Sequence, residues 1–335
     1  MMSGLPSRYG RKAARFALRQ VPTGFYRRVI QRDAIGFVYH TVASQPLPHV
    51  KHLYAFKTPE EFEQDILFFQ SRYSFLSLED LRDAKPRGKR PGLFITFDDG
   101  MAECFRVVRP ILLKHRVPCV FFITTAFLDN KEMFYRHKVS LCIEAAHTAP
   151  NSQREALLQY AGVSTLSAFK SWIKNLTLAE EATIDRVCAL CGVDPAAYLQ
   201  RDRPYLTTDE LHQMIADGFT IGAHTLRHPN LSKLSAPSMI ESEIVDSCST
   251  IRKMTQADKV PFAFPYSADG IDRSFLRNIL AKHDFIGPLF DAHGIAAETP
   301  LIRTRIAGDV RRPAGTLIRQ AYVNESQKRL RIPND

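Results

Sequence analysis

The sequence predicts an α/β protein, a distorted (β/α) barrel of about seven parallel strands with a helical insertion. Short runs of strand-forming residues alternate with helical patterns, which is typical of a parallel sheet. Reactive side chains follow several of these runs, at the strand ends where (β/α) barrels hold such groups. The alternation is interrupted once, between about residues 130 and 203. We therefore expect an arm at 1–32, the barrel at 33–310 and a C-terminal tail at 311–335.

Seven apolar runs predict the strands. They are Ala34–His40, Leu93–Phe97, Cys119–Thr124, Thr220–Ala223, Phe262–Phe264, Phe285–Phe290 and Leu301–Ile306. The clearest helix begins at Thr58, where Thr-Pro-Glu-Glu forms a capping box with proline at the first helical position, and continues to about Arg72. Helical patterns also cover Met101–His115, Thr208–Asp217, Ser238–Thr255 and Ser274–His283.

The interruption between about Asn130 and Arg203 is longer than an ordinary crossover between strands. It predicts four helices, Lys131–Thr148, Ser152–Gly162, Leu166–Lys174 and Leu178–Cys191. One interpretation is a helical cap that covers the side of the barrel. The other is a lid that shapes a substrate cleft, which Tyr135, Arg136 and His137 would then face.

Two adjacent carboxylates end one of the predicted strands. Asp98, Asp99 and Gly100 directly follow Leu93–Phe97. Because neighbouring anions repel each other, a nearby cation is the natural explanation for the pair. A polar turn that leaves the strand is the simpler alternative, since Asp-Gly turns are common.

Two histidines follow another predicted strand. His224 and His228 come after Thr220–Ala223 and are four residues apart, so both rings reach one metal if the chain turns after the first. Gly222 and Pro229 argue against one continuous helix there. Two unrelated surface histidines are the alternative, which leaves the aspartate pair unexplained.

Two histidines and one carboxylate form a facial ligand set that leaves positions open for water and substrate. Zinc, the divalent metal that we expect, lowers the pKa of a water molecule that it holds to about 7. Only one of Asp98 and Asp99 is needed as a ligand, so the other is available as a general base. These residues predict metal-assisted hydrolysis, but they do not decide which aspartate does which task.

Three motifs make the chain similar to a known family. Thr96–Gly100, His224–His228 and Phe262–Tyr266 resemble, in order and spacing, the first three motifs of the polysaccharide deacetylases, the carbohydrate esterases with NodB homology. The resemblance spans roughly residues 35–306.

This resemblance implies a role for each motif. Asp98 corresponds to the catalytic base, and Asp99, His224 and His228 correspond to the metal ligands. The backbone N–H of Tyr266 corresponds to a group that helps to hold the oxyanion.

The family's late Leu-x-His motif, which supplies the general acid, is missing after Tyr266. Phe37–His40 is similar to that strand moved to the front of the chain, as in the circularly permuted poly-N-acetylglucosamine deacetylases. The resemblance then implies His40 as general acid. A core histidine that ends a strand is the alternative for His40, and His137 and His293 are the other candidates for the acid.

The arginine that orients the base in the family is also missing from the third motif. The strand Leu301–Ile306 is the best substitute source. By alternation, Arg303 and Arg305 share one face of this strand, and we prefer Arg305.

Composition is ordinary for a globular protein, with 45% hydrophobic and 24% charged residues in a chain of 335. The longest nearly apolar stretch, 117–128, is shorter than the about 20 residues of a transmembrane helix. No signal-peptide core follows the basic start. The six cysteines are scattered, and Cys188 and Cys191 form a lone C-x-x-C that we interpret as two thiols near a helix core. These features predict a cytoplasmic protein with free thiols.

The net charge of +10 is concentrated in residues 1–32, which contribute +8 and contain no acidic residue. Helical spacing places one basic stripe on this arm, made of Arg8, Arg11, Lys12, Arg15 and Arg19. The arm either contacts an anionic membrane surface or packs on the barrel. A transit peptide or a nucleic-acid partner is disfavoured, because the rest of the chain is nearly neutral and shows no binding motif.

The combined expectation is a divalent-metal hydrolase that removes an N-acetyl group from an amino sugar. A location at the inner leaflet favours a lipid-linked or nucleotide-linked precursor of a cell-surface polysaccharide over the finished polymer. An O-acetyl esterase and a sugar deformylase are the alternatives within hydrolases. A catalytically silent carbohydrate-binding protein is the alternative outside them, and the missing arginine is its only support.

Overall fold

The computed structural model describes residues 20–21, 24–26, 30, 34–82, 90–292, 294–295 and 301–330. Seven parallel strands close into a barrel: β1 (Ala34–Tyr39), β3 (Gly92–Phe97), β4 (Cys119–Ile123), β5 (Thr220–Ala223), β6 (Val260–Ala263), β7 (Ile286–Asp291) and β8 (Ile302–Ala307). Their order is β1-β8-β7-β6-β5-β4-β3, and the β1–β3 pairing closes the ring. The short β2 (Ser74–Phe75) pairs with the start of β3. The predicted distorted barrel is confirmed.

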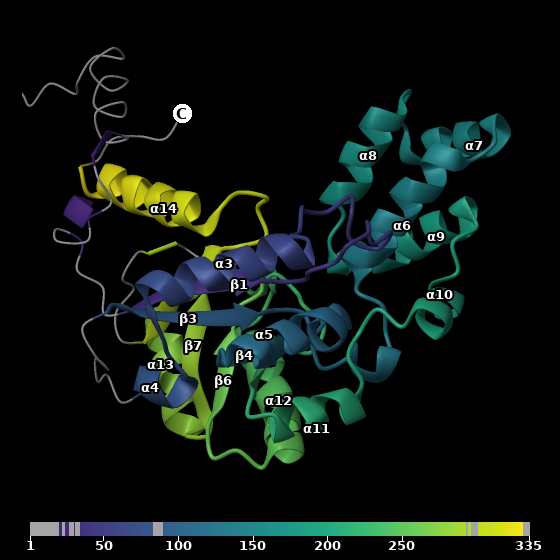
Figure 1. Ribbon diagram of the computed structural model, residues 1–335. Helices are drawn as coiled ribbons and strands as arrows, with labels where there is room; N and C mark the ends of the chain where they lie inside the picture. The colour runs from purple at the N-terminus through teal and green to yellow at the C-terminus, as the bar shows by residue number, and fades with distance from the viewer. Residues whose placement is uncertain are drawn as a thin grey trace, which may run out of the picture.

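Helices surround the strands (Figure 1): α3 (Pro59–Arg72), α4 (Leu78–Arg82), α5 (Arg109–His115), α11 (Thr208–Ala216), α12 (Pro237–Thr255), α13 (Arg273–Lys282) and α14 (Ala314–Arg329). The predicted capping box opens α3, since Glu61 N–H donates to Thr58 Oγ1 at 3.2 Å and Thr58 N–H donates to Glu61 at 2.9 Å. The last helix, α14, lies within the segment 311–335 that we expected to be a tail.

The predicted helix Met101–His115 is divided. A π-helical turn, η1 (Cys104–Val108), precedes α5. Pro110 has no N–H to donate one turn back, so the helical hydrogen-bond register changes next to it.

The segment between β4 and β5 forms a group of helices beside the barrel, in teal at the upper right of Figure 1. It contains η2 (Leu128–Asn130), α6 (Tyr135–Thr148), α7 (Asn151–Ala161), α8 (Leu166–Asn175), η3 (Leu178–Glu180), α9 (Glu181–Cys191) and α10 (Pro195–Asp202). Helix α6 packs against both α8 and α9. Helix α10 was not expected, although Asp194 caps it by accepting from Ala197 N–H at 3.0 Å and Pro195 begins it.

All six cysteines are free and buried. Cys188 and Cys191 lie on α9 and face α6, where Cys142 Sγ is 3.4 Å from Cys188 Sγ. Of the helices that the structure describes, none combines the length and apolar character that a membrane span requires.

Most of the predicted arm, including its basic stripe, lies outside the described residues. Of the arm residues that the structure describes, Tyr26 and Ile30 are buried. The Tyr26 ring stacks on Tyr322 of α14, with ring centroids 6.2 Å apart. This end of the arm therefore packs on the folded body.

The interior of the barrel contains a cluster of buried aromatic and aliphatic side chains, among them Phe94, Val120, Phe122 and Phe290. Phe290 lies between two other rings, 5.7 Å from Phe94 and 5.2 Å from Phe122. Glycines on neighbouring strands make room for these rings, because a Cβ at Gly36 would lie 2.3 Å from Phe94 and one at Gly222 would lie 2.6 Å from Phe122. This cluster provides a floor for the groups described next, since Phe122 and Phe290 lie against the Arg305 guanidinium.

Candidate metal and catalytic site

The C-terminal ends of five strands bring the predicted site residues to one edge of the barrel. His40 follows β1, Asp98 and Asp99 follow β3, His224 follows β5, Tyr266 lies beyond β6, and Arg305 is on β8. Parallel strands in a closed barrel end at the same rim, so residues far apart in the sequence meet there. The structure thus places all the predicted metal ligands and catalytic groups at this rim.

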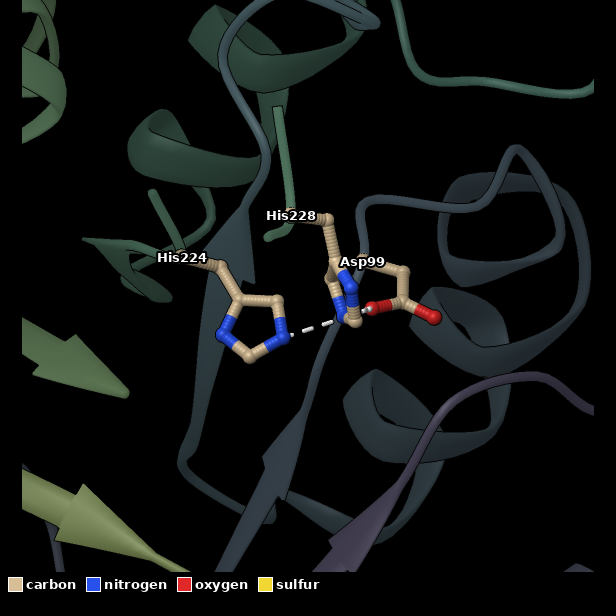
Figure 2. Close-up of side chains that lie close together, drawn as sticks. All are labelled: Asp99, His224 and His228. Atoms are coloured by element: carbon tan, nitrogen blue, oxygen red, sulfur yellow. Dashed lines mark ion pairs between the residues drawn. The ribbon is translucent and has the colours of Figure 1, made fainter. Parts of the chain in front are cut away.

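Asp99, His224 and His228 form the tightest group at this edge. Figure 2 shows the two imidazole rings and the carboxylate turned towards one another. Asp99 Oδ1 is 3.4 Å from His224 Nε2 and 3.1 Å from His228 Nε2. One ligand atom from each residue lies within 4.8 Å of the others, and all three side chains are buried. Among the described residues, this is the one group with the composition and spacing of a metal site.

The backbone turns sharply to bring the two histidines together. Thr225 and His228 have φ of 67° and 58°, in the left-handed region. Thr225 Oγ1 accepts from His228 N–H at 3.0 Å and donates to the His224 carbonyl at 2.5 Å, which fixes the turn. The chain therefore turns after the first histidine, as the spacing required. Asp99 also has a left-handed φ of 73°.

The hydrogen bond of His224 Nδ1 orients the ring so that a cation fits between Nε2 and Asp99. His224 Nδ1 is 2.9 Å from the carbonyl oxygen of Ala263, which only accepts, so Nδ1 carries a hydrogen, and the neutral ring that binds a metal then has its lone pair on Nε2. Asp99 Oδ1 faces this lone pair and, although buried, makes no hydrogen bond. Two such acceptors repel each other unless a cation lies between them. The residues present therefore fit a divalent metal with His₂Asp ligation.

Asp98 is held by Arg305, the arginine preferred from the sequence. Arg305 Nη1 and Nη2 donate to the two carboxylate oxygens of Asp98 at 2.7 and 2.9 Å. Burial raises the pKa of Asp98, but the Arg305 charge and the nearby His224 outweigh burial and lower this pKa below its usual value. Asp98 is therefore ionised at neutral pH. Both of its oxygens accept hydrogen bonds from Arg305, so Asp98 is not needed as a metal ligand.

Arg305 itself is completely buried inside the barrel. Nη1 also donates to Thr96 Oγ1 at 2.8 Å, and Nε donates to the Asp291 carbonyl at 3.3 Å. Its guanidinium lies 5.3 Å from the centroid of Phe122 and 5.9 Å from that of Phe290, the rings of the barrel floor. A buried charge needs such partners, and Arg305 is fixed by them in a single position.

His40 pairs with Asp309, a residue that the sequence reasoning missed. His40 Nδ1 is 2.6 Å from Asp309 Oδ2, and its backbone N–H donates to Oδ1 at 2.9 Å. Burial lowers the pKa of His40, but the Asp309 carboxylate, helped by Asp99 and Asp98, raises it to about 10. His40 is therefore a cation at neutral pH, with a proton to give. The signal for Asp309 is its place two residues after β8, the strand whose alternation predicts Arg305.

Tyr266 has a left-handed backbone, with φ of 58°, directly after Pro265. No acceptor for its backbone N–H is found among the described residues, so this donor is available. The Tyr266 side chain is 43% exposed, and its ring lies 5.2 Å from that of His228. The Tyr266 ring is thus next to a predicted metal ligand.

The other candidates for the general acid are less suitable. His137 is buried, with Nδ1 2.7 Å from the hydroxyl of Tyr205, and burial lowers its pKa well below the usual value, so it is neutral. His293 lies outside the described residues.

Comparisons with known proteins agree with this geometry. The family model "Polysaccharide deacetylase" matches residues 85–285, more than half of the chain. No curated protein matches the chain in sequence. Similar solved structures include deacetylase PplD of Streptococcus pyogenes, with 16% identity, a TM-score of 0.52, and 82% of this chain and 91% of that chain covered.

IcaB of Ammonifex degensii is 13% identical, with a TM-score of 0.52, and 87% of this chain and 96% of that chain are covered. A de-N-acetylase of Aggregatibacter actinomycetemcomitans is 14% identical, with a TM-score of 0.52, and 86% and 99% are covered. At these identities the structures establish a shared fold. With the family model and the three motifs at the barrel edge, the chain belongs to the polysaccharide deacetylase family, and it is a hydrolase that acts on carbohydrate.

Proposed function

We propose that this protein is a metal-dependent hydrolase that removes an N-acetyl group from an amino sugar. The observation that carries the proposal is the arrangement around the aspartate pair. Asp98 is ionised and fixed by Arg305, while the adjacent Asp99 turns away towards His224 and His228. A general base thus lies one residue from a metal ligand.

Each side chain then has one task in the hydrolysis. Asp98 takes a proton from the attacking water, whose oxygen forms the new bond to the acyl carbon. The backbone N–H of Tyr266 donates to the oxyanion that develops. His40 gives its proton to the amine nitrogen as the C–N bond breaks. Asp99, His224 and His228 would hold a divalent ion, which would supply Lewis-acid polarisation of the carbonyl and a more acidic water.

Arg305 and Asp309 are positioning residues in this scheme. Arg305 keeps Asp98 ionised and pointed at the water, and Asp309 keeps His40 protonated. Proton transfer by a positioned side chain contributes roughly 10²–10⁴-fold in rate, which is the scale at stake for each pair.

A protonated acid favours an amide substrate over an ester. An amine leaves poorly unless it is protonated, whereas an alkoxide leaves more readily, so a fixed donor such as His40 matters most for C–N cleavage. The fold is shared with a protein described as a de-N-acetylase, which supports the same choice. An O-acetyl esterase and a sugar deformylase use the same ligands and are the competing reactions. The contact of Arg305 with Asp98 argues against a silent binding protein, whose only support was a missing arginine.

The proposal extends to the metal and the location. Zinc suits a His₂Asp set best among the common divalent ions. Six free, buried thiols and the basic arm support a cytoplasmic protein that contacts the inner leaflet. There it would act on a lipid-linked or nucleotide-linked precursor of a cell-surface polysaccharide.

The test is metal analysis of protein purified without chelator, together with a screen of acetylated and formylated saccharides for released acid. We expect stoichiometric divalent metal and acetate release from N-acetylated sugars. His224→Ala should lose both metal and activity, while His212→Ala, at an exposed histidine on α11, should keep both. Formate release, or acetate from O-acetyl sugars alone, would assign a competing reaction. Stoichiometric metal without any released acid would favour the alternative of a catalytically silent carbohydrate-binding protein.

A further inference from the structure

Arg136 in the first turn of α6 is a cation beside the catalytic edge that the proposed chemistry does not use. Its Nε–H is shared between the hydroxyls of Tyr135, at 3.1 Å, and Tyr266, at 3.4 Å. Its Nη1 donates to the backbone carbonyl of Lys174 at the end of α8. The guanidinium also lies 5.0 Å from the centroid of the Tyr135 ring. These contacts fix the group between the insertion and the barrel.

Arg136 has donors left after these bonds. The remaining N–H groups, on Nη1 and Nη2, have no partner among the described residues. No carboxylate of the described chain lies within ion-pair distance of Arg136. A half-buried guanidinium normally pairs with an anion. For Arg136, the described residues supply no such anion.

Lys174 of α8 lies near Arg136, and Lys170 lies near Lys174. Neither lysine has an acidic partner among the described residues, although Lys174 Nζ donates to the His52 carbonyl at 2.9 Å. Burial, together with the positive charges of Lys170 and Arg136, lowers the pKa of Lys174, as expected within a cluster of like charges. The acidic residues of this region are already paired with other cations. They are Glu144 with Lys51 and His52, Glu181 and Asp185 with Lys138, and Glu132 with Arg227.

The cluster is connected to the catalytic edge through Tyr266. The hydroxyls of Tyr135 and Tyr266 are 2.7 Å apart, so one donates to the other and the second hydroxyl hydrogen is left to donate elsewhere. The Tyr266 ring lies 5.2 Å from the ring of His228, a predicted metal ligand. One tyrosine side chain therefore separates the free N–H groups of Arg136 from the reaction centre.

We propose that Arg136, supported by Lys170 and Lys174, binds an anionic group of the substrate, a phosphate ester or a carboxylate, so that the protein prefers acetylated saccharides that carry such a group. The planar guanidinium fork matches the oxygens of either group. This inference rests on the proposed function for the identity of the reacting sugar. The inference adds a substrate class and a specificity-determining residue to the proposed function.

The experiment compares anionic and neutral probes. The anionic probes are N-acetylglucosamine 1-phosphate and the disaccharide of glucuronate with N-acetylglucosamine, and the neutral probes are methyl N-acetylglucosaminide and diacetylchitobiose. The dissociation constant of each is measured by calorimetry, and acetate release is measured in parallel. We expect an anionic probe to bind about tenfold more tightly than the neutral ones, as for one charge-assisted contact. Phosphate and carboxylate probes distinguish the two sources of charge.

Three variants locate the effect. Arg136→Gln should abolish the preference and change binding of the neutral probes by less than about twofold, whereas Arg136→Lys should keep part of it. Lys138→Gln is the matched control on the same helix, because its cation is already paired with Glu181 and Asp185. It should leave the preference unchanged.

Two results would overturn the inference. One is equal affinity of the unmodified protein for anionic and neutral probes. The other is an equal loss for both in Arg136→Gln, which would mean that Arg136 only supports Tyr266. Acetate release without a preference for anionic probes would support the proposed hydrolase and contradict the anion-binding role of Arg136. Arg136-dependent binding of anionic probes without acetate release would support the anion-binding role of Arg136 and contradict the proposed hydrolase.

Discussion

The charged catalytic groups at the barrel edge and the cluster around Arg136 in the helical insertion differ in whether they have partners of opposite charge. At the barrel edge, each charged catalytic group has a buried or half-buried partner of opposite sign, Asp98 with Arg305 and His40 with Asp309. In the insertion, Arg136, Lys170 and Lys174 have no such partner among the described residues. Groups that move protons need a fixed protonation state, which a partner supplies. Groups that bind a charged ligand need their charge to be available.

One strand supplies both partners at the barrel edge. Arg305 lies on β8 and Asp309 lies two residues beyond it, and they contact groups that follow β3 and β1. The strands β1 and β3 are paired with each other, and β8 lies on the other side of β1. The base and the acid are thus positioned from a single segment of the barrel, and changes there should alter rate rather than substrate preference.

The largest effect is expected from breaking the pair around the base. Asp98→Asn removes the proton acceptor, so kcat should fall roughly 10²–10⁴-fold. The metal content should stay unchanged, because Asp98 is not among the ligands. Both are measured on one preparation, by acetate release and by elemental analysis.

Asp99→Asn is the matched control for this variant, since it makes the same change one residue away. It should lose metal as well as activity. Full activity in Asp98→Asn would contradict the proposed mechanism. Metal loss in Asp98→Asn but not in Asp99→Asn would mean that the roles of the two aspartates are reversed. Thermal unfolding must be compared too, because an uncompensated buried Arg305 destabilises the fold by about 3–5 kcal/mol.

A smaller effect is expected from the pair around the acid, and it should appear in the pH profile. His40 acts as an acid only while protonated, so kcat should hold until the pH rises towards its pKa of about 10. Asp309→Asn removes the charge that raises this pKa, while burial still lowers it. The alkaline limb of kcat should therefore move to lower pH, with near-normal rates retained on the acid side. Rates measured across the pH range report this shift.

Two further variants sharpen the result. His40→Ala should lower turnover at every pH and leave the metal in place. Asp217→Asn is a control for loss of a paired carboxylate, since Asp217 pairs with Arg109 before β5, at the opposite end of the strands. An unmoved alkaline limb in Asp309→Asn, or normal turnover in His40→Ala, would return the role of acid to another group.

The same contrast explains what the sequence could predict. Strands and ligand motifs are local patterns, so all seven barrel strands and the His224–His228 turn could be placed from the sequence. Arg305 followed from alternation along one strand. Asp309 did not, because it pairs with a residue 269 positions away and belongs to no motif. The roles of Asp98 and Asp99 came only from the family resemblance, and the structure distinguishes them by their neighbours.

The structure of the insertion was harder to predict from the sequence, because its contacts also join residues far apart in the chain. Four of its helices, α6 to α9, could be predicted from their periodicity, whereas α10 was missed. The free donors of Arg136 depend on which acids pair with other cations, and no sequence pattern records such pairings. The π-helical turn before α5 was missed because Pro110 changes the hydrogen-bond register without changing the apolar spacing.

The smallest effect on catalysis is expected from the arm, where cations are again proposed to bind an external anion. The stripe Arg8, Arg11, Lys12, Arg15 and Arg19 would bind anionic lipid at about 1 kcal/mol per residue near the surface. Full-length protein should sediment with anionic vesicles at low salt and be released as salt screens the attraction. Changing the five residues to glutamine should abolish sedimentation and leave kcat on a soluble substrate unchanged. Substitution is preferred to deletion of residues 1–32, which would also remove the buried Tyr26 and Ile30. Neutral vesicles are the control. If the full-length chain does not sediment with anionic vesicles at low salt, membrane contact is refuted, and the deacetylase assignment is unaffected.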